Sequence, residues 1–220
     1  MSFLAFFEIS SCYFVNSLDI LTINTVNMSY CLSICQHIVF DYLPILSMHF
    51  SKLHSHFLDM IMIGIGYDVH RLAEGESLIL GGVTIESPLG SVAHSDGDVV
   101  LHALCDALLG AAGLGDIGEH FPDTDPRWKN APSRMFVEHA IQLLAEHGYI
   151  PVNIDITLIL EAPKIKPYKE AMRMEIASMT GLPFQRVSVK ATTNESIGFA
   201  GRKEGVAALC ACMIKEGDRS

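Results

Sequence analysis

The sequence is short of positive charge, and this shortage limits its partners. Its 220 residues include 15 Lys and Arg against 25 Asp and Glu, which gives a formal net charge of −10 at pH 7. Nucleic-acid-binding proteins usually carry a basic patch, and the sequence shows none, so we expect no nucleic-acid partner. An acidic protein that handles phosphates needs metal ions or backbone N–H groups to tolerate these anions.

The cysteines also lack a functional spacing. The six residues form no CxxC pair, and half of them fall within the first 60 residues. Cys210 and Cys212 are two positions apart, so on a strand they would share one face. We expect buried free thiols rather than a disulfide framework, and a cytoplasmic location.

Residues 1–60 lack the patterning of the rest of the chain. No Lys or Arg precedes Lys52, and the apolar residues show no sustained period of two or of 3.6. The stretch has neither the positive start of a signal peptide nor the arginines of a transit peptide. The uncharged run between Asp19 and Asp41 leaves a membrane span open, but polar residues dilute this run and no flanking Lys or Arg anchors it. We interpret residues 1–60 as an extension that is disordered or not native, for example through a start codon assigned too early. Residues 61–220 are then the functional domain, and we expect no membrane partner.

From Met62 onward the pattern predicts an α+β fold. Strands are expected at 62–67, 154–160, 187–191 and 206–214, and a hairpin joins 78–80 to 83–85 through Gly81-Gly82. Helices are expected at 98–112, at 133–147 with Ser133 as the cap and Gly148 as the end, and at 167–180. Strands and helices alternate without a regular βαβ repeat, which favours α+β over a doubly wound sheet.

Asp68 and His70 end the first predicted strand, two residues apart. An extended backbone would point both side chains to one face. With His102, on the helix that follows, they make one carboxylate and two imidazoles, a ligand set typical of catalytic zinc with one open position. Spacing alone leaves alternatives open. Asp98, His102 and Asp106 could simply form a polar helix face, or either aspartate could orient His102.

Three loops carry residue types that bind phosphates, hydroxyls or bases. The segment 113–125 holds glycines and aspartates but lacks the Lys-Ser/Thr ending of a P-loop, so it suits hydroxyls or metals. The segment 190–202 offers threonines, Glu195 and Arg202, a set that suits a diphosphate with its cation. The proline-stiffened segment 160–166 could present backbone groups to a base edge. Each segment also fits an ordinary polar loop or connector.

Five motifs occur in a fixed order along the chain. They are Gly66-Tyr67-Asp68-Val69-His70, His94-Ser95-Asp96-Gly97-Asp98, Leu114-Gly115-Asp116-Ile117-Gly118, Phe121-Pro122-Asp123-Thr124-Asp125 and Lys190-Ala191-Thr192-Thr193. Together they resemble the 2-C-methyl-D-erythritol 2,4-cyclodiphosphate synthase family. The resemblance runs from about Ile63 to Lys215 and leaves residues 1–60 outside it.

The resemblance implies a fold, an assembly and a reaction. It implies a mixed β-sheet packed on one side by helices, assembling as a homotrimer with active sites between subunits. The implied enzyme is a metal-dependent phosphorus–oxygen lyase of the non-mevalonate isoprenoid pathway. It converts 4-diphosphocytidyl-2-C-methyl-D-erythritol 2-phosphate to 2-C-methyl-D-erythritol 2,4-cyclodiphosphate and CMP. Because a substrate phosphate is the nucleophile, no Ser–His or Cys–His pair is required.

The resemblance also implies residue roles. Asp68, His70 and His102 match the ligands of Zn²⁺ or another divalent metal, and Glu195 matches a ligand of Mg²⁺ or Mn²⁺ at the diphosphate. His94 and Thr193 match the residues that stabilise the transition state. The remaining positions match substrate-binding residues. They are Val69, Ser95, Asp116, Ile117, Gly118, Phe121, Pro122, Asp123, Thr124 and Asp125; around cytidine and diphosphate, Leu160, Glu161, Ala162, Pro163, Lys164, Ile165, Lys166 and Thr192; and, completing the match, Asn194, Phe199 and Arg202. We also place the metal ligands, His94 and Thr193 in contact with the substrate.

Overall fold

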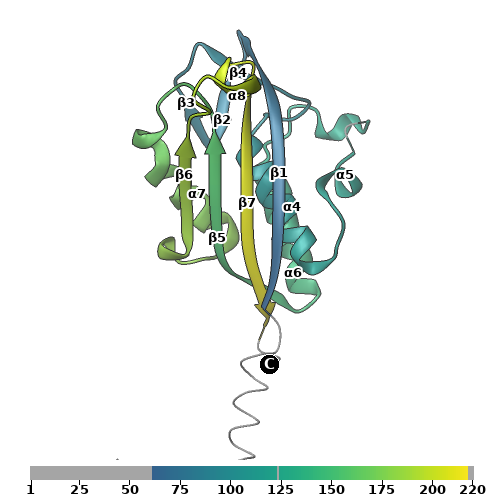
Figure 1. Cartoon of the computed structure of the whole chain (residues 1–220). Helices are drawn as coiled ribbons and strands as arrows, with labels where there is room; N and C mark the ends of the chain where they lie inside the picture. The colour runs from purple at the N-terminus through teal and green to yellow at the C-terminus, as the bar shows by residue number, and fades with distance from the viewer. Residues whose placement is uncertain (1–60, 123, 218–220) are drawn as a thin grey trace, which may run out of the picture. The chain divides into compact units, whose positions relative to one another are not determined.

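A computed structural model describes residues 61–122 and 124–217, which are built on a five-stranded mixed sheet of order β4-β1-β7-β5-β6 (Figure 1). Within this sheet β5 and β6 run parallel and the other neighbours run antiparallel. The strands are β1 Ile61–Glu74, β4 Leu89–Val92, β5 Tyr149–Ile159, β6 Val187–Thr192 and β7 Gly205–Glu216. A separate hairpin pairs β2 Leu78–Leu80 with β3 Val83–Ile85.

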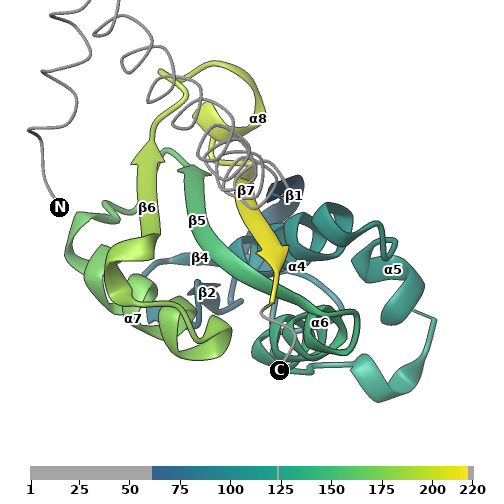
Figure 2. The same ribbon diagram turned by 90° about the horizontal axis from the view of Figure 1, so that it is seen from below.

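The longer helices α4, α6 and α7 lie on the same side of the sheet (Figure 2). The α-helices are α4 Val99–Ala112, α5 Ile117–His120, α6 Arg134–Glu146, α7 Lys169–Thr180 and α8 Gly198–Gly201. Short 3-10 turns add η2 Pro126–Trp128, η3 Lys166–Tyr168 and η4 Phe184–Arg186. Among the described residues, no helix is both long enough and apolar enough to cross a membrane.

Two glycines bring α4 unusually close to β1. A Cβ atom added at Gly64 or Gly66 would lie 1.9 Å from a backbone carbonyl oxygen of α4. Real side chains cannot tolerate that distance, so only glycine permits this approach. The close packing places the α4 side chains directly beside the β1 side chains that point to the same side.

Along β1, the opposite face of the sheet is apolar, and none of the described elements covers it. Ile63, Ile65 and Tyr67 are 66%, 69% and 53% exposed, while the alternate positions Gly64 and Gly66 are buried under α4. The prediction of a mixed sheet covered on one side by helices is therefore confirmed. The bare face differs from an ordinary protein surface, because exposed apolar side chains there stand in a continuous row.

The predicted elements are confirmed, with some differences in extent. The 78–85 hairpin and the helix after Asp98 match the prediction, and Cys105, Cys210 and Cys212 are buried free thiols. The strand β1 runs on to Glu74 because it pairs with β4, which was not predicted. The third helix begins with the 3-10 turn η3, and the regular helix starts later than expected. The prediction for residues 1–60 lies outside the described residues.

Candidate functional site

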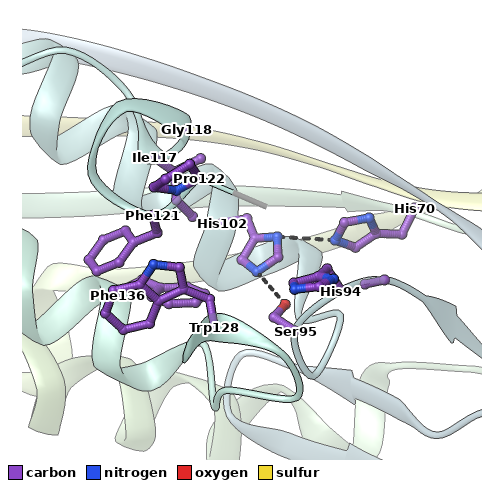
Figure 3. Close-up of a pocket in the computed structure, with 11 residues that line it drawn as sticks. His70, His94, Ser95, His102, Ile117, Gly118, Phe121, Pro122, Trp128 and Phe136 are labelled. Atoms are coloured by element: carbon purple, nitrogen blue, oxygen red, sulfur yellow. Dashed lines mark hydrogen bonds between the residues drawn. The ribbon is translucent and has the colours of Figure 1, made fainter. Parts of the chain in front are cut away.

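Asp68 and His70 on β1 and His102 on α4 converge to one point. The His102 Nδ1 atom lies 3.0 Å from Asp68 Oδ2 and 3.1 Å from His70 Nε2, and the last two atoms are 3.2 Å apart. Figure 3 shows His102 between His70 and Ser95. In the part of the chain that the structure describes, these three residues form a group whose ligand atoms all lie within 4.8 Å, close enough to share one metal ion. The two strand residues point to the helix side, as their spacing predicted.

The pKa shifts of Asp68 and His70 favour metal binding. Burial alone would raise the pKa of Asp68, but the adjacent His102 and His70 side chains outweigh it and lower that pKa. Burial lowers the pKa of His70, against the opposing charge of Asp68. An ionised carboxylate and a neutral imidazole are the forms that bind metal ions. One oxygen and two nitrogens fit Zn²⁺, which commonly takes three protein ligands and keeps a fourth position open.

Asp98 and Asp106 do not orient His102, and this alternative is wrong. The fully buried Asp98 carboxylate caps α4 by accepting the N–H groups of Val100 and Leu101. It also accepts the N–H groups of Gly81 and Gly82 in the hairpin turn. The Asp106 carboxylate accepts the N–H of Ile117 instead. Complete burial raises the pKa of Asp98 to about 6, although these backbone donors favour its ionised form.

Two residues of the triad, His70 and His102, line a cavity of about 500 Å³. One wall is polar, with His94 and Ser95, and the other is aromatic, where the Phe121 ring lies 4.5 Å from that of Phe136 and 5.0 Å from that of Trp128 (Figure 3). Four residues expected at the methylerythritol part line this cavity: Ile117, Gly118, Phe121 and Pro122. Sequence reasoning missed Trp128 and Phe136. Phe136 had a signal, since it lies on the buried side of α6, but Trp128 had none.

The remaining residues predicted to bind substrate between Asp116 and Asp125 have local structural roles or lie outside the described residues. Asp116 caps α5 by accepting the N–H of Glu119, and Asp125 caps η2 and pairs with Arg127. Thr124 is exposed, and Asp123 lies outside the described residues. Contacts among the described residues therefore place Ile117, Gly118, Phe121 and Pro122 at the cavity, while the carboxylates of Asp116 and Asp125 bond to neighbouring residues of their own loop.

A second, smaller cavity of about 150 Å³ lies where β5 and β6 end. Three lysines line it beside Thr192 and Thr193, which makes this end of the sheet a positive region in an acidic protein. Next to it, Thr193 Oγ1 donates to Glu195 Oε1 at 2.6 Å, and the Asn194 N–H donates to Glu161. The cavity holds most of the expected cytidine and diphosphate residues: Leu160, Glu161, Pro163, Lys164, Ile165, Lys166, Thr192 and Thr193.

Comparison with known proteins decides the family. Residues 61–215 match the YgbB family. The chain belongs to this family. It is 57% identical over 153 residues to the 2-C-methyl-D-erythritol 2,4-cyclodiphosphate synthase of Chlorobaculum tepidum, which covers 70% of this chain and 98% of that protein. The family resemblance predicted from the sequence is confirmed.

Solved structures agree with this family. The bifunctional IspDF of Campylobacter jejuni aligns with a TM-score of 0.70 and 49% identity, over 72% of this chain and 43% of that chain. A 2-C-methyl-D-erythritol-2,4-cyclodiphosphate synthase in a CDP-bound form aligns with a TM-score of 0.65 and 40% identity, over 70% of this chain and 99% of that chain. These likenesses cover the domain that holds both cavities.

One chain of this family member does not bring all predicted site residues together. Asp68 and His70 of the triad lie on β1 and the Thr192–Glu195 segment begins at the end of β6, with β7 and β5 between these two strands in the sheet. Three inter-strand steps of about 4.8 Å separate these strands. The two cavities share no lining residue. Phe199, on α8, and Arg202, which pairs with Glu204, line neither cavity.

Proposed function

We propose that the protein is a 2-C-methyl-D-erythritol 2,4-cyclodiphosphate synthase that releases CMP from 4-diphosphocytidyl-2-C-methyl-D-erythritol 2-phosphate. The observation that carries this proposal is the triad of Asp68, His70 and His102, which opens onto a cavity with one polar and one aromatic wall. The relatives with this printed activity cover the same domain, and one was solved with CDP. A cytoplasmic location stays a prediction.

The proposed reaction needs positioning and charge neutralisation rather than an enzyme nucleophile. An oxygen of the 2-phosphate attacks the β-phosphorus, a new P–O–P bond forms, and the bond from the β-phosphorus to the CMP oxygen breaks. CMP leaves with that electron pair. Holding the flexible substrate so that these atoms meet accounts for much of the acceleration in such reactions.

Residues of both cavities would share this work. Asp68, His70 and His102 would hold a divalent metal, which supplies positive charge beside a phosphate. His94 would donate a hydrogen bond to a phosphate oxygen from the polar wall of the larger cavity. Thr193 and Glu195, already joined by a hydrogen bond, would bind the diphosphate oxygens and its Mg²⁺ or Mn²⁺.

The proposal includes a homotrimer with shared active sites. Its support is the row of exposed apolar side chains along β1, which no described element covers, and the separation of the two cavities within one chain. Packing the bare faces of three chains together would cover Ile63, Ile65 and Tyr67. It would also allow the Thr192–Glu195 segment of one chain to meet the triad of another.

Phosphorus NMR in oxygen-18 water tests the reaction directly. We expect the cyclic diphosphate and CMP to form together, without label in either product, because the nucleophile belongs to the substrate. A metal-dependent hydrolase would use the same ligands with a metal-bound water. Linear products that carry oxygen-18 would therefore replace the cyclase proposal with that one.

A further inference from the structure

Ser133 stands at the start of α6 but does not cap the helix. A serine at this position usually accepts a backbone N–H of the first helical turn. Here the side chain makes no such bond, which corrects the capping role predicted from the sequence. The residue is fully buried, and its hydroxyl donates to Asp96 Oδ1 and lies 2.8 Å from His102 Nε2. The hydroxyl is thus directed at a triad residue instead of at its own helix.

The direction of these hydrogen bonds fixes the imidazole proton. A hydroxyl has one hydrogen, and a carboxylate can only accept, so the Ser133 hydrogen goes to Asp96. The hydroxyl oxygen must then accept from His102, which places a proton on Nε2 and leaves Nδ1 with a free lone pair. The Nδ1 atom is the one that faces Asp68 and His70.

The loop that contains Asp96 holds this arrangement firmly. The Asp96 carboxylate also accepts the Ser133 backbone N–H at 3.0 Å, and the Asp96 N–H donates to the Ala131 carbonyl at 3.1 Å. A carboxylate bonded to both the N–H and the O–H of one serine leaves that serine little freedom to turn its hydrogen toward His102.

We propose that Asp96 and Ser133 are positioning residues that keep His102 in its Nε2–H tautomer, so that Nδ1 is free to bind a metal. The inference rests on the proposed metal site. The other tautomer would donate its Nδ1–H to Asp68 Oδ2, 3.0 Å away, and would occupy two ligand atoms at once. The Asp96–Ser133 pair opposes this self-blocked state. Outer partners of metal-binding histidines commonly act in this way.

The first measurement uses the metal-free protein. Long-range proton–nitrogen NMR of labelled histidine, in mildly alkaline buffer, reports which ring nitrogen of His102 carries the proton. We expect the Nε2–H pattern in the wild-type protein and an increased Nδ1–H population in Ser133→Ala. Zinc affinity, measured by competition with a chelator, should weaken by roughly 10- to 100-fold. Ser95 Oγ, 3.1 Å from the same nitrogen, remains as a second acceptor and limits the loss.

Two further variants make the test specific. Ser91→Ala removes another buried serine hydroxyl, one without a hydrogen-bond partner among the described residues, and should change neither the tautomer nor the zinc affinity. Asp96→Asn keeps the shape but removes the charge, and should shift both readouts in the direction of Ser133→Ala. If Ser133→Ala fails to fold, Asp96→Asn alone tests whether the Asp96–Ser133 pair positions His102.

The outcomes separate the two proposals. A wild-type protein that binds no zinc would refute the metal site itself. A wild-type protein that binds zinc, with a tautomer and affinity unchanged in the folded variants of Ser133 and Asp96, would overturn the positioning role and leave the metal site standing.

Discussion

The cavity beside the triad and the cavity at the ends of β5 and β6 differ in how completely one chain builds them. The side chains of Asp68, His70 and His102 are only 25%, 16% and 12% exposed, and strand, helix and loop fix them from several directions. The segment beside the smaller cavity is an open loop in which Asn194 and Glu195 are exposed. Glu195 and Ser196 also have positive φ values of 51° and 63°.

This difference indicates that the metal site is already formed within one chain, whereas the segment beside the smaller cavity needs further contacts. Positive φ is unfavourable for residues other than glycine and persists where surrounding contacts or bound groups compensate for it. In a single chain, Glu195 has Thr193 as its hydrogen-bond donor and otherwise faces solvent. We call the triad with its cavity the first region, and the smaller cavity with the Thr192–Glu195 segment the second region. We infer that the first region binds its metal without a neighbouring subunit, and that the second acts only with a neighbouring subunit and substrate.

The largest effect is expected at the first region. His102→Ala should lose most of the bound zinc and the turnover, because it removes one ligand and the partner of Asp68. The loss of zinc affinity should exceed the roughly 10- to 100-fold seen when only an outer partner of a ligand is removed. Elemental analysis and circular dichroism measure metal content and folding. The control His147→Ala, at the exposed end of α6, should keep its zinc. Full zinc occupancy in a folded His102→Ala protein would refute the site.

We expect subunit contact to affect the region around the smaller cavity alone. Ile65→Lys places a charge on the bare sheet face, and a buried unpaired charge costs about 3–5 kcal/mol. We expect a monomer by light scattering that retains zinc but has lost most of its turnover. Met174→Lys, at a 55% exposed position on α7, is the matched control and should remain a trimer. A fully active monomeric Ile65→Lys protein would contradict the shared site.

A smaller effect is expected when one hydroxyl of the second region is removed. Thr193→Val keeps the shape but cannot donate to an oxygen whose charge grows in the transition state. Such donors commonly contribute about 2.7–4 kcal/mol, so the turnover rate should fall roughly 100- to 1000-fold. CMP binding should change far less, and zinc content not at all. The exposed Thr84 on β3 provides a neutral Thr→Val control. An equal loss in CMP affinity and in turnover would make Thr193 a simple binding residue.

Local pattern predicted the fold where the elements are long and periodic or where turn residues mark a hairpin. The helix after Asp98 and the Gly81-Gly82 hairpin follow from apolar spacing, a cap and turn residues. The strand β4 and the helices α5 and α8 were missed, because four residues are too few to show a period. Their formation depends on contacts made by the rest of the chain, such as the pairing of β4 with the end of β1.

The site residues were likewise predicted where local pattern sufficed and missed where long-range contacts decide. Asp68 and His70 could be placed on one face because a strand alternates its side chains, and this required no knowledge of the fold. Ser133 was misinterpreted as a helix cap because its partner Asp96 lies 37 residues away in sequence. Asp98 looked like a partner of His102 on the helix, but the hairpin turn and the helix N-terminus use its carboxylate. Long-range contacts decided both cases, and a single sequence does not display them.

The smallest effect is expected from removing residues 1–60. The family match begins at residue 61, and every residue assigned here to either cavity follows that point. The first 60 residues contain Lys52 as their single Lys or Arg and none of the predicted ligands. We therefore expect a protein that starts at Met60 to fold, to bind zinc and to form the cyclic diphosphate at the full-length rate. Light scattering, elemental analysis and the phosphorus NMR assay on both lengths measure this.

These measurements also distinguish the two regions. Loss of zinc in the shortened protein would show that residues 1–60 support the triad. Retained zinc with lost turnover would show that they support the trimer and the second cavity. Either result would show that residues 1–60 are a working part of the enzyme.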